Sequence, residues 1–318
     1  MIILNLYIDK YNCRISISGN KLILTKDSEI KTFPTGNIDS ISINKNVQIT
    51  SQAICKLSEE NIDISWFSSN QMICHTCGSK NIFRLKQQFD LLNNDKFRLQ
   101  IAKKNIASKI NNQMYFIDKQ KQFKVKDVKK NNSVESLLGV EGKYAVFYFS
   151  ELKNRFPDKY NFKTRKKHPP EDPVNSVLSF AYALLYNKVT SVINQHGLNP
   201  SVGFCHTLKN NHYALSSDLM ESLRCDICDS IAVELFSKMP DSDEFQNTDN
   251  GVMLSKGIKQ DIISGFHNNL NKIAYTENGF SDDFNGVINQ IVCSYGKALE
   301  TQDISYFKPY MAGENYDV

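Results

Sequence analysis

The strongest constraint on the fold of this chain is a change in hydrophobic periodicity near residue 80. Before that point, apolar residues recur at every second position, which is the spacing of strands with one buried face. These residues are Ile15 and Ile17, Leu22 and Leu24, Ile41 and Ile43, and Ile62, Ile64 and Trp66. Beyond it the apolar residues follow a helical period. The sequence therefore predicts an α+β fold, with a small N-terminal β domain over residues 1–82 and a larger all-α domain over residues 83–318.

Local signals refine both predicted domains. Gly19-Asn20 divides two alternating runs as a hairpin turn does. Residues 48–61 change to a helical period, and Thr50 or Ser51 can cap this inserted helix. The second domain begins with the polar, basic run FRLKQQFDLLNNDKFRLQIAKKNIASKI. Its further helices are predicted at Val134–Lys153, Asn175–His196 (stopped by Gly197), Ser217–Lys238, Lys256–Asn271 and Asp282–Thr301. Residues 240–251 contain many turn-forming residues and predict the most flexible connection.

Composition excludes several classes of protein. With 41% hydrophobic and 23% charged residues, the 318-residue chain has ordinary globular usage and is expected to fold. The 38 basic and 34 acidic residues leave a net charge of +4, too small to indicate nucleic-acid binding by itself. No stretch reaches the ~18 consecutive apolar residues of a membrane span, and Met1–Ile8 lacks a secretory leader, so we expect a cytoplasmic protein without a membrane partner. The eight cysteines are too sparse for a disulfide framework.

Glu141, His206 and Glu221 are candidate metal ligands, because metal-dependent phosphodiester chemistry needs carboxylate oxygens, often with one imidazole. Glu141 lies in the apolar stretch GVEGKYAVFYF, where a carboxylate is drawn toward the interior. A solvated glutamate in a first helical turn is the alternative for this residue. His206 lies on a predicted loop after Gly203, where a satisfied, partly buried histidine is the commoner alternative.

Asp218 and Glu221 are three residues apart on a predicted helix and therefore share one face. Together they can approach a cation. Alternatively they form a capping box, in which Asp218 caps the helix and Glu221 reaches back. Arg224, one turn further on, can also neutralise Glu221. The local pattern leaves these alternatives open.

Two Cys-x-x-Cys pairs raise the alternative of a zinc site. They are Cys74/Cys77 and Cys225/Cys228. The gap between the pairs is unusually long, and the second pair falls in a helical run where both thiols are expected in the core. A shared zinc is therefore a minor hypothesis, with Cys74/Cys77 as the more ligand-like half.

Basic residues cluster on both sides of Glu141 in the sequence. One run contains Lys119, Lys121, Lys124, Lys126, Lys129 and Lys130, and the other contains Lys163, Arg165, Lys166, Lys167 and His168. Interleaved aromatic residues favour binding along a phosphate backbone, although a solvated surface helix has a similar composition. The residues that we expect to contact double-stranded DNA are Lys163, Arg165, Lys166, Lys167 and Arg224.

Taken together, these segments resemble the Cas1 family, the CRISPR-associated integrases that insert new spacers. The resemblance spans nearly the whole chain. It is carried by GVEGKYAVFYF around Glu141, RKKHPPEDPVNSVLSFAYALLYN over residues 165–187, GFCH ending at His206, and SDLMESLR over residues 217–224. This sequence departs from the family at Cys205, where an aliphatic residue is more usual, and at Cys225-Asp226, where proline is frequent.

The resemblance implies a site and a set of partners. Glu141, His206 and Glu221 would bind Mg²⁺ or Mn²⁺, with Asp218 as an auxiliary acidic residue. A β domain used for dimerisation and DNA contact would pack on a helical catalytic domain. Homodimers would flank a dimer of the small Cas2 subunit and hold a prespacer duplex.

The expected function is a metal-dependent DNA integrase and endonuclease of CRISPR adaptation, in which a prespacer 3′-hydroxyl attacks a phosphodiester of the repeat. One alternative is a casposase-like integrase of a transposon, which normally carries an additional DNA-binding extension. The other is a catalytically silent DNA-binding scaffold, which a Glu141→Ala variant with intact integration would favour.

Overall fold

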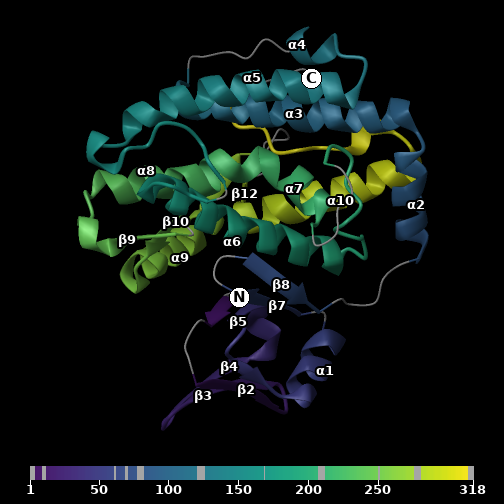
Figure 1. The fold of residues 1–318 in the computed structure, drawn as a ribbon. Coiled ribbons are helices and arrows are strands. Elements are labelled where there is room, and N and C mark those ends of the chain that lie inside the picture. Colours follow the sequence, from purple (N-terminus) through teal and green to yellow (C-terminus); the bar gives the residue numbers. More distant parts are fainter. Residues whose placement is uncertain are drawn as a thin grey trace.

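The computed structural model describes residues 4–8, 12–60, 62–68, 71–76, 82–119, 126–167, 169–206, 212–249, 251–275 and 281–313. A β part lies beneath a larger helical part (Figure 1). Each part has its own cluster of buried apolar side chains. The fold is therefore mixed α+β, as the periodicity predicts.

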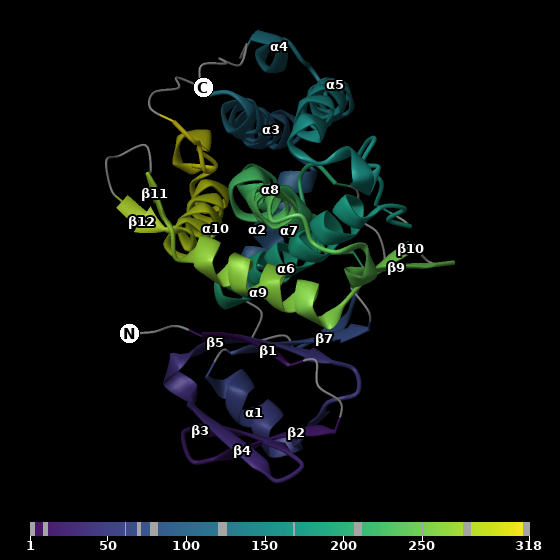
Figure 2. The ribbon, with the colours of Figure 1, turned by 90° about the vertical axis from the view of Figure 1, so that its left-hand side faces the viewer.

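The β part contains two four-stranded sheets with a helix between them (Figure 2). The upper sheet has the order β1-β5-β7-β8 and the lower sheet the order β4-β3-β2-β6. The strands are β1 Leu4–Ile8, β2 Cys13–Ser18, β3 Lys21–Lys26, β4 Glu29–Pro34, β5 Ile38–Asn44, β6 Gln48–Ile49, β7 Asp63–Ser68 and β8 Gln71–His75. Helix α1, Ser51–Glu59, contacts β2 of one sheet and β7 of the other.

The local signals of the β part are confirmed. The alternating residues supply its core, with Ile15, Leu22, Ile41, Ile43 and Ile64 fully buried. Gly19, in the turn between β2 and β3, has a φ of +56°, a conformation that glycine adopts without a Cβ penalty. Thr50 caps α1, because its side chain accepts a hydrogen bond from the Ala53 amide at 3.2 Å.

The helical part is built around one central helix, α6, which contacts α7, α8, α9, α10 and strand β10. Its helices are α2 Ile82–Leu92, α3 Asp95–Ile117, α4 Lys126–Lys129, α5 Val134–Leu152, α6 Pro173–Gln195, α7 Ala214–Met220, α8 Ser230–Ser237, α9 Lys256–Leu270 and α10 Phe284–Thr301. Within the described residues, α6 alone is long and apolar enough to cross a membrane, but most of it is buried in the fold, as in a core helix. Helices α3 and α5 pack side by side above it (Figures 1 and 2).

The prediction of an all-α second part needs correction, because that part also contains strands. They form two antiparallel pairs: β9 Phe245–Thr248 with β10 Gly251–Leu254, and β11 Ile273–Tyr275 with β12 Ser281–Asp283. Strand β9 and the first residue of β10 fall in the segment predicted to be the most flexible. Strand β10 packs on the helical part because Val252 and Leu254 bury their side chains, and the Val252 amide donates to the Pro170 carbonyl at 2.9 Å.

The predicted helix over residues 217–238 is helical but irregular. Helix α7 ends at Met220, a 3₁₀ turn follows over Glu221–Leu223, and a π-helical turn covers Cys225–Asp229 before α8 begins. Such departures from α-helical hydrogen bonding often occur at functional sites. Here the irregular segment carries both Glu221 and Arg224.

Candidate metal centre

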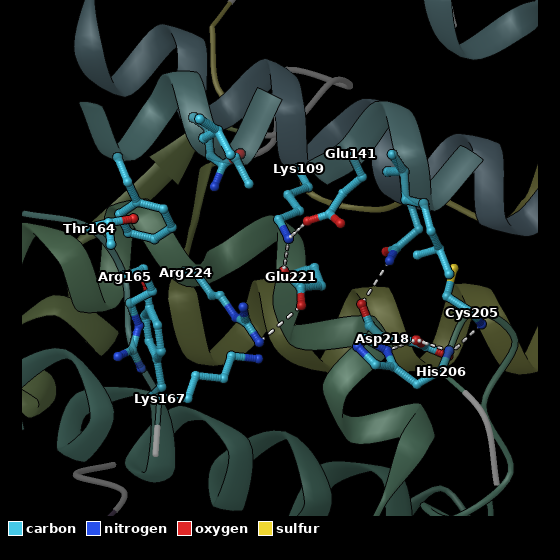
Figure 3. Close-up of a pocket in the computed structure, with 18 residues that line it drawn as sticks. Lys109, Glu141, Thr164, Arg165, Lys167, Cys205, His206, Asp218, Glu221 and Arg224 are labelled. Atoms are coloured by element: carbon cyan, nitrogen blue, oxygen red, sulfur yellow. Dashed lines mark hydrogen bonds and ion pairs between the residues drawn. The ribbon is translucent and has the colours of Figure 1, made fainter. Parts of the chain in front are cut away.

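A cavity of about 310 Å³ opens where α3, α5 and α7 meet the segments around residues 164–167 and 205–206 (Figure 3). All four side chains predicted for catalysis line it: Glu141, His206, Asp218 and Glu221. The fold therefore brings together groups that lie far apart in the sequence.

Asparagines on α3 support the irregular backbone beside this cavity. The Asn105 amide group donates to the Asp218 carbonyl at 2.7 Å, and the Asn112 amide group donates to the Ser222 carbonyl at 2.6 Å. Because helix ends and turns leave carbonyls without intrahelical partners, buried amides at these positions stabilise the turn that presents Glu221.

Glu221 is the most enclosed carboxylate of the site after Asp218, with only 8% of its side chain exposed. Its Oε1 lies 2.9 Å from Arg224 Nη2, and its Oε2 lies 2.7 Å from Lys109 Nζ. Burial acts to raise the pKa of Glu221, but the positive charges of Arg224 and Lys109 outweigh burial and lower this pKa to about 2. Glu221 is therefore ionised at neutral pH.

Lys109 bridges the two candidate carboxylate ligands (Figure 3). Its ammonium donates a hydrogen bond to Glu141 Oε1 and forms an ion pair with Glu221. The Lys109 side chain is 9% exposed, and Glu141 has 21% of its side chain exposed. Although burial acts to lower the pKa of Lys109, the charges of Glu221 and Glu141 raise it overall. Lys109 is thus a charged, buried cation at the centre of the site.

Asp218 organises His206 and the loop that carries it. His206 Nδ1 lies 2.5 Å from Asp218 Oδ1. The same carboxylate accepts hydrogen bonds from the backbone amides of Phe204 at 2.6 Å, Cys205 at 3.0 Å and His206 at 3.1 Å. The hydrogen bond to Asp218 raises the pKa of His206. Since Nδ1 is engaged, Nε2 is the ring nitrogen left for a cation.

The close approach of this loop depends on Gly203. A Cβ at that position would lie 2.5 Å from Asp218 Oδ2 and 2.7 Å from the Ala214 backbone carbon. A side chain there would displace the carboxylate that holds His206.

The capping-box alternative for Asp218 and Glu221 is wrong. Tyr213 is the N-cap residue of α7, and no side chain caps it. Asp218 instead lies fully buried against the 204–206 backbone, and Glu221 pairs with Lys109 and Arg224. The idea that Arg224 neutralises Glu221 is confirmed.

Two tyrosines, of which Tyr182 lines the cavity, and a buried carboxylate support the arginines. The guanidinium groups of Arg165 and Arg224 lie 5.2 Å and 4.9 Å from the centre of the Tyr182 ring. The hydroxyls of Tyr182 and Tyr148 each donate to Asp229 at 2.6 Å. This network holds Arg224 beside Glu221.

The sequence reasoning missed Lys109, Tyr182 and Asp229. One signal was available for Lys109, because Asn105, Lys109 and Asn112 fall on a single face of α3, at spacings of four and three. A polar face inside an otherwise buried helix indicates a buried polar partner.

The predicted DNA-binding residues have different surroundings. Arg165, Lys167 and Arg224 line the cavity. Arg165 donates to Asn175 at 2.9 Å and Ser179 at 3.0 Å, and the charge of Arg224 lowers the pKa of Lys167. Lys163, Lys166 and Lys167 are exposed, and Lys166 pairs with Glu171 at 2.5 Å.

The other basic run is only partly described. Lys119, Lys129 and Lys130 are exposed. Lys121, Lys124 and His168 lie outside the described residues, as does the side chain of Lys126.

The cysteine pairs do not form a joint site among the described residues. Cys225 and Cys228 are buried, and the Cys228 thiol donates to the Ala181 carbonyl at 3.4 Å. Burial raises the pKa of both thiols, which disfavours the thiolates that zinc needs. Cys74 is exposed on β8, and Cys77 lies outside the described residues.

The side chains of the site are of the types that bind a hard divalent ion. Two carboxylates face one cation position, and an imidazole in the same cavity has its other nitrogen held by a carboxylate. Glu221 Oε2 accepts no well-aligned hydrogen bond within the described residues, although Lys109 lies close to it. No three Asp, Glu, His or Cys side chains in that part of the chain converge on one point. The position between the carboxylates holds the Lys109 ammonium instead.

The chain is similar in sequence to known proteins of one family. The family model described as CRISPR associated protein Cas1 matches residues 6–268. A CRISPR-associated exonuclease Cas4/endonuclease Cas1 fusion from Leptospira interrogans is 32% identical over 280 residues, covering 79% of this chain and 52% of the relative. The chain thus spans about half the length of that fusion.

Two solved structures cover nearly the whole chain. A casposase bound to integration product superposes with a TM-score of 0.82 and 25% identity, covering 98% of this chain and 93% of the casposase chain. A chain of a Cas6-RT-Cas1–Cas2 complex superposes with a TM-score of 0.82 and 21% identity, covering 96% of this chain and 36% of that chain.

Proposed function

The chain belongs to the CRISPR-associated Cas1 family, and from this premise we propose that it is a divalent-metal-dependent DNA integrase and endonuclease of CRISPR adaptation. The observation that carries the proposal is the meeting of Glu141, His206 and Glu221 in one cavity whose wall also contains four lysine and arginine side chains. Carboxylates and an imidazole suit Mg²⁺ or Mn²⁺, and the basic groups suit a phosphodiester.

In the proposed reaction, the 3′-hydroxyl of a prespacer strand attacks a phosphorus atom at the repeat boundary. A bond forms between that oxygen and phosphorus, and the P–O3′ bond of the repeat strand breaks. The attacking hydroxyl gives its proton to solvent, and the leaving O3′ takes a proton from solvent to become a new 3′-hydroxyl. With water as the attacking group, the same site nicks DNA. Glu141, His206 and Glu221 would hold the ion, which when bound stabilises charge on the phosphate and activates the hydroxyl.

The other residues of the cavity bind and orient. Lys167 and Arg224 face the cavity and would contact phosphate oxygens. Asp218 is fully buried and already accepts four hydrogen bonds or ion pairs, so we assign it to positioning His206. This assignment makes Asp218 a positioning residue, because it acts through the imidazole.

We propose the partners by the same reasoning. The solved casposase is bound to an integration product, which supports DNA as a partner of this chain. The complex that contains a similar chain also contains Cas2, which supports this small subunit as a partner. We further propose that residues 1–82 form a separate domain serving dimerisation and DNA contact, in a cytoplasmic homodimer.

The test is strand transfer of a labelled duplex with free 3′ ends into a supercoiled plasmid carrying a repeat. Joining is expected with Mn²⁺ or Mg²⁺, and not with EDTA, and should be lost in Glu141→Ala, His206→Ala and Glu221→Ala. The exposed residues Glu135, on α5, and Glu234, on α8, provide matched alanine controls that should retain joining.

Each alternative predicts a different result in the same assay. Joining that persists in the three variants would refute the assigned site. DNA binding without joining, under any metal and with Cas2 present, would favour the scaffold. Equal joining into plasmids with and without the repeat would favour the casposase-like activity.

DNA binding by the cavity wall should depend strongly on salt. For B-DNA, the logarithm of the binding constant falls with the logarithm of salt concentration with a slope of about −0.9 per phosphate contact. Lys167→Ala should weaken binding regardless of sequence and make this slope less steep by about 1. Lys238→Ala is the control, because Lys238 is exposed and pairs only locally with Glu234 at 3.1 Å. An unchanged slope in Lys167→Ala would show that Lys167 does not contact a phosphate.

A further inference from the structure

The cation position of the site is filled by a residue of the chain itself. The Lys109 ammonium lies between Glu141 and Glu221, and Arg224 lies 2.9 Å from the second oxygen of Glu221. Both oxygens of Glu221 therefore already face a positive group. Lys167 adds a further charge on the same cavity wall.

This arrangement opposes binding of a divalent ion to the protein alone. An entering ion must replace the attraction between Lys109 and two carboxylates, and it also meets repulsion from the neighbouring cations. In the buried surroundings of Lys109, whose side chain is 9% exposed, solvent screens these charges only weakly.

Of the two cations that contact Glu221, Lys109 is the one able to move. Arg224 is held by the face of the Tyr182 ring at 4.9 Å, and Tyr182 is anchored through Asp229. Lysine places a compact charge on a flexible four-carbon stem, whereas a stacked guanidinium is fixed in orientation. Lys109 also lines the cavity, so its ammonium can turn toward a group bound there.

A DNA phosphate is the group that would draw Lys109 away. It brings negative charge to a wall that already contains Lys109, Lys167 and Arg224. With a phosphate in the cavity, the ammonium gains a new partner, and the carboxylates become available to a divalent ion without a net loss of compensating charge.

We propose that Lys109 is a resident counter-ion, which holds Glu141 and Glu221 in the metal-free protein and transfers to a DNA phosphate when the divalent ion binds. The inference rests on the proposed function of this site and extends it to regulation. Metal and DNA then bind with positive coupling, and by linkage each raises the affinity of the other by the same factor, typically about 5- to 150-fold.

The test measures Mn²⁺ affinity from the electron paramagnetic resonance signal of free Mn²⁺. It compares protein alone with protein saturated by a duplex whose 3′ ends are dideoxy, so that no joining occurs. In the wild type, DNA should raise Mn²⁺ affinity about tenfold, within the usual range of coupling. Lys109→Met should bind Mn²⁺ about tenfold more tightly than the wild type without DNA and show smaller coupling.

Lys103→Met is the matched control. Lys103 is on the same helix, and its ammonium donates to the Lys129 carbonyl at 2.9 Å, away from the cavity lining. Its Mn²⁺ affinity should equal that of the wild type. Lys109→Met should also unfold at a lower temperature in EDTA and regain stability with Mn²⁺, because the ion replaces the missing charge. A merely structural lysine would not produce tighter metal binding.

Several outcomes would overturn the inference. If Lys109→Met binds Mn²⁺ no more tightly than the wild type, Lys109 does not compete with the ion. If DNA leaves the Mn²⁺ affinity of the wild type unchanged, the coupling is absent. This measurement uses only the wild type, so it does not depend on whether a variant folds. In either case, metal-dependent joining by the wild type that is lost in Glu141→Ala would leave the proposed function intact. If neither the wild type nor any variant binds Mn²⁺ with DNA present, both this inference and the proposed function are overturned.

Discussion

Glu221→Ala is expected to abolish metal-dependent joining and to destabilise the folded protein at the same time. A metal ion acting as a Lewis acid supplies several kcal/mol of transition-state stabilisation, so loss of a ligand should slow joining by at least ~10³-fold. Removing this carboxylate also leaves Lys109 and Arg224 buried without their shared partner. Breaking a buried ion pair by deleting one member costs about 3–5 kcal/mol of unfolding free energy.

Glu141→Ala is the informative comparison for this prediction. It should lose joining to a similar extent but with a smaller loss of stability, because Glu141 is 21% exposed and Lys109 keeps its ion pair with Glu221. Strand transfer measures the first effect, and urea denaturation in EDTA measures the second. If Glu221→Ala is as stable as the wild type, the buried ion pairs of Glu221 do not stabilise the protein. If Glu221→Ala retains joining, Glu221 is not a metal ligand.

Asp218→Ala is expected to have the second largest effect, acting through His206. The substitution leaves the backbone amides of Phe204, Cys205 and His206 without their acceptor and frees the imidazole. Since each unsatisfied buried donor costs about 1–3 kcal/mol, the unfolding free energy should fall by at least ~3 kcal/mol. Loss of the group that orients a metal-binding histidine typically reduces metal affinity or activity by about 10- to 100-fold.

A double-mutant cycle separates positioning from direct chemistry. If Asp218 acts only by holding His206, then Asp218→Asn combined with His206→Ala should join DNA as slowly as His206→Ala alone. Asparagine is used here because its size and amide oxygen preserve most of the local packing. Additive losses in the double variant would show that Asp218 takes part in the reaction itself, as a proton acceptor.

The order of the elements was largely predictable from local patterns. The alternation at Ile15, Ile41 and Ile64 predicted buried strand faces, because a strand with one buried face repeats every two residues. The N-cap at Thr50 and the end of α6 before Gly197, with its φ of +69°, were also predictable, since capping depends on residues adjacent in sequence. Glu141, His206 and Glu221 were identified through the resemblance to a family, not through spacing alone.

The strands of the second part were not predictable in the same way. The β9–β10 pair lies in a polar, turn-rich segment, and only Val252 and Leu254 point inward from β10. Two buried positions are too few for a periodic signal, so contact with α6 decided this structure. The 3₁₀ and π-helical turns between α7 and α8 likewise depend on partners from α3, such as Asn105 and Asn112.

By itself, the sequence determined the strands of the first part, the long helices of the second and the types of side chain available for chemistry, because periodicity and capping act over a few neighbouring residues. Only the tertiary structure decided how those side chains are paired. Lys109 meets Glu141 and Glu221 because α3 packs beside α5 and against the irregular turn after α7. Asp218 faces the His206 backbone, and not the start of its own helix, because Gly203 permits a close approach. Charge pairing across such distances in sequence is set by packing, which local patterns do not encode.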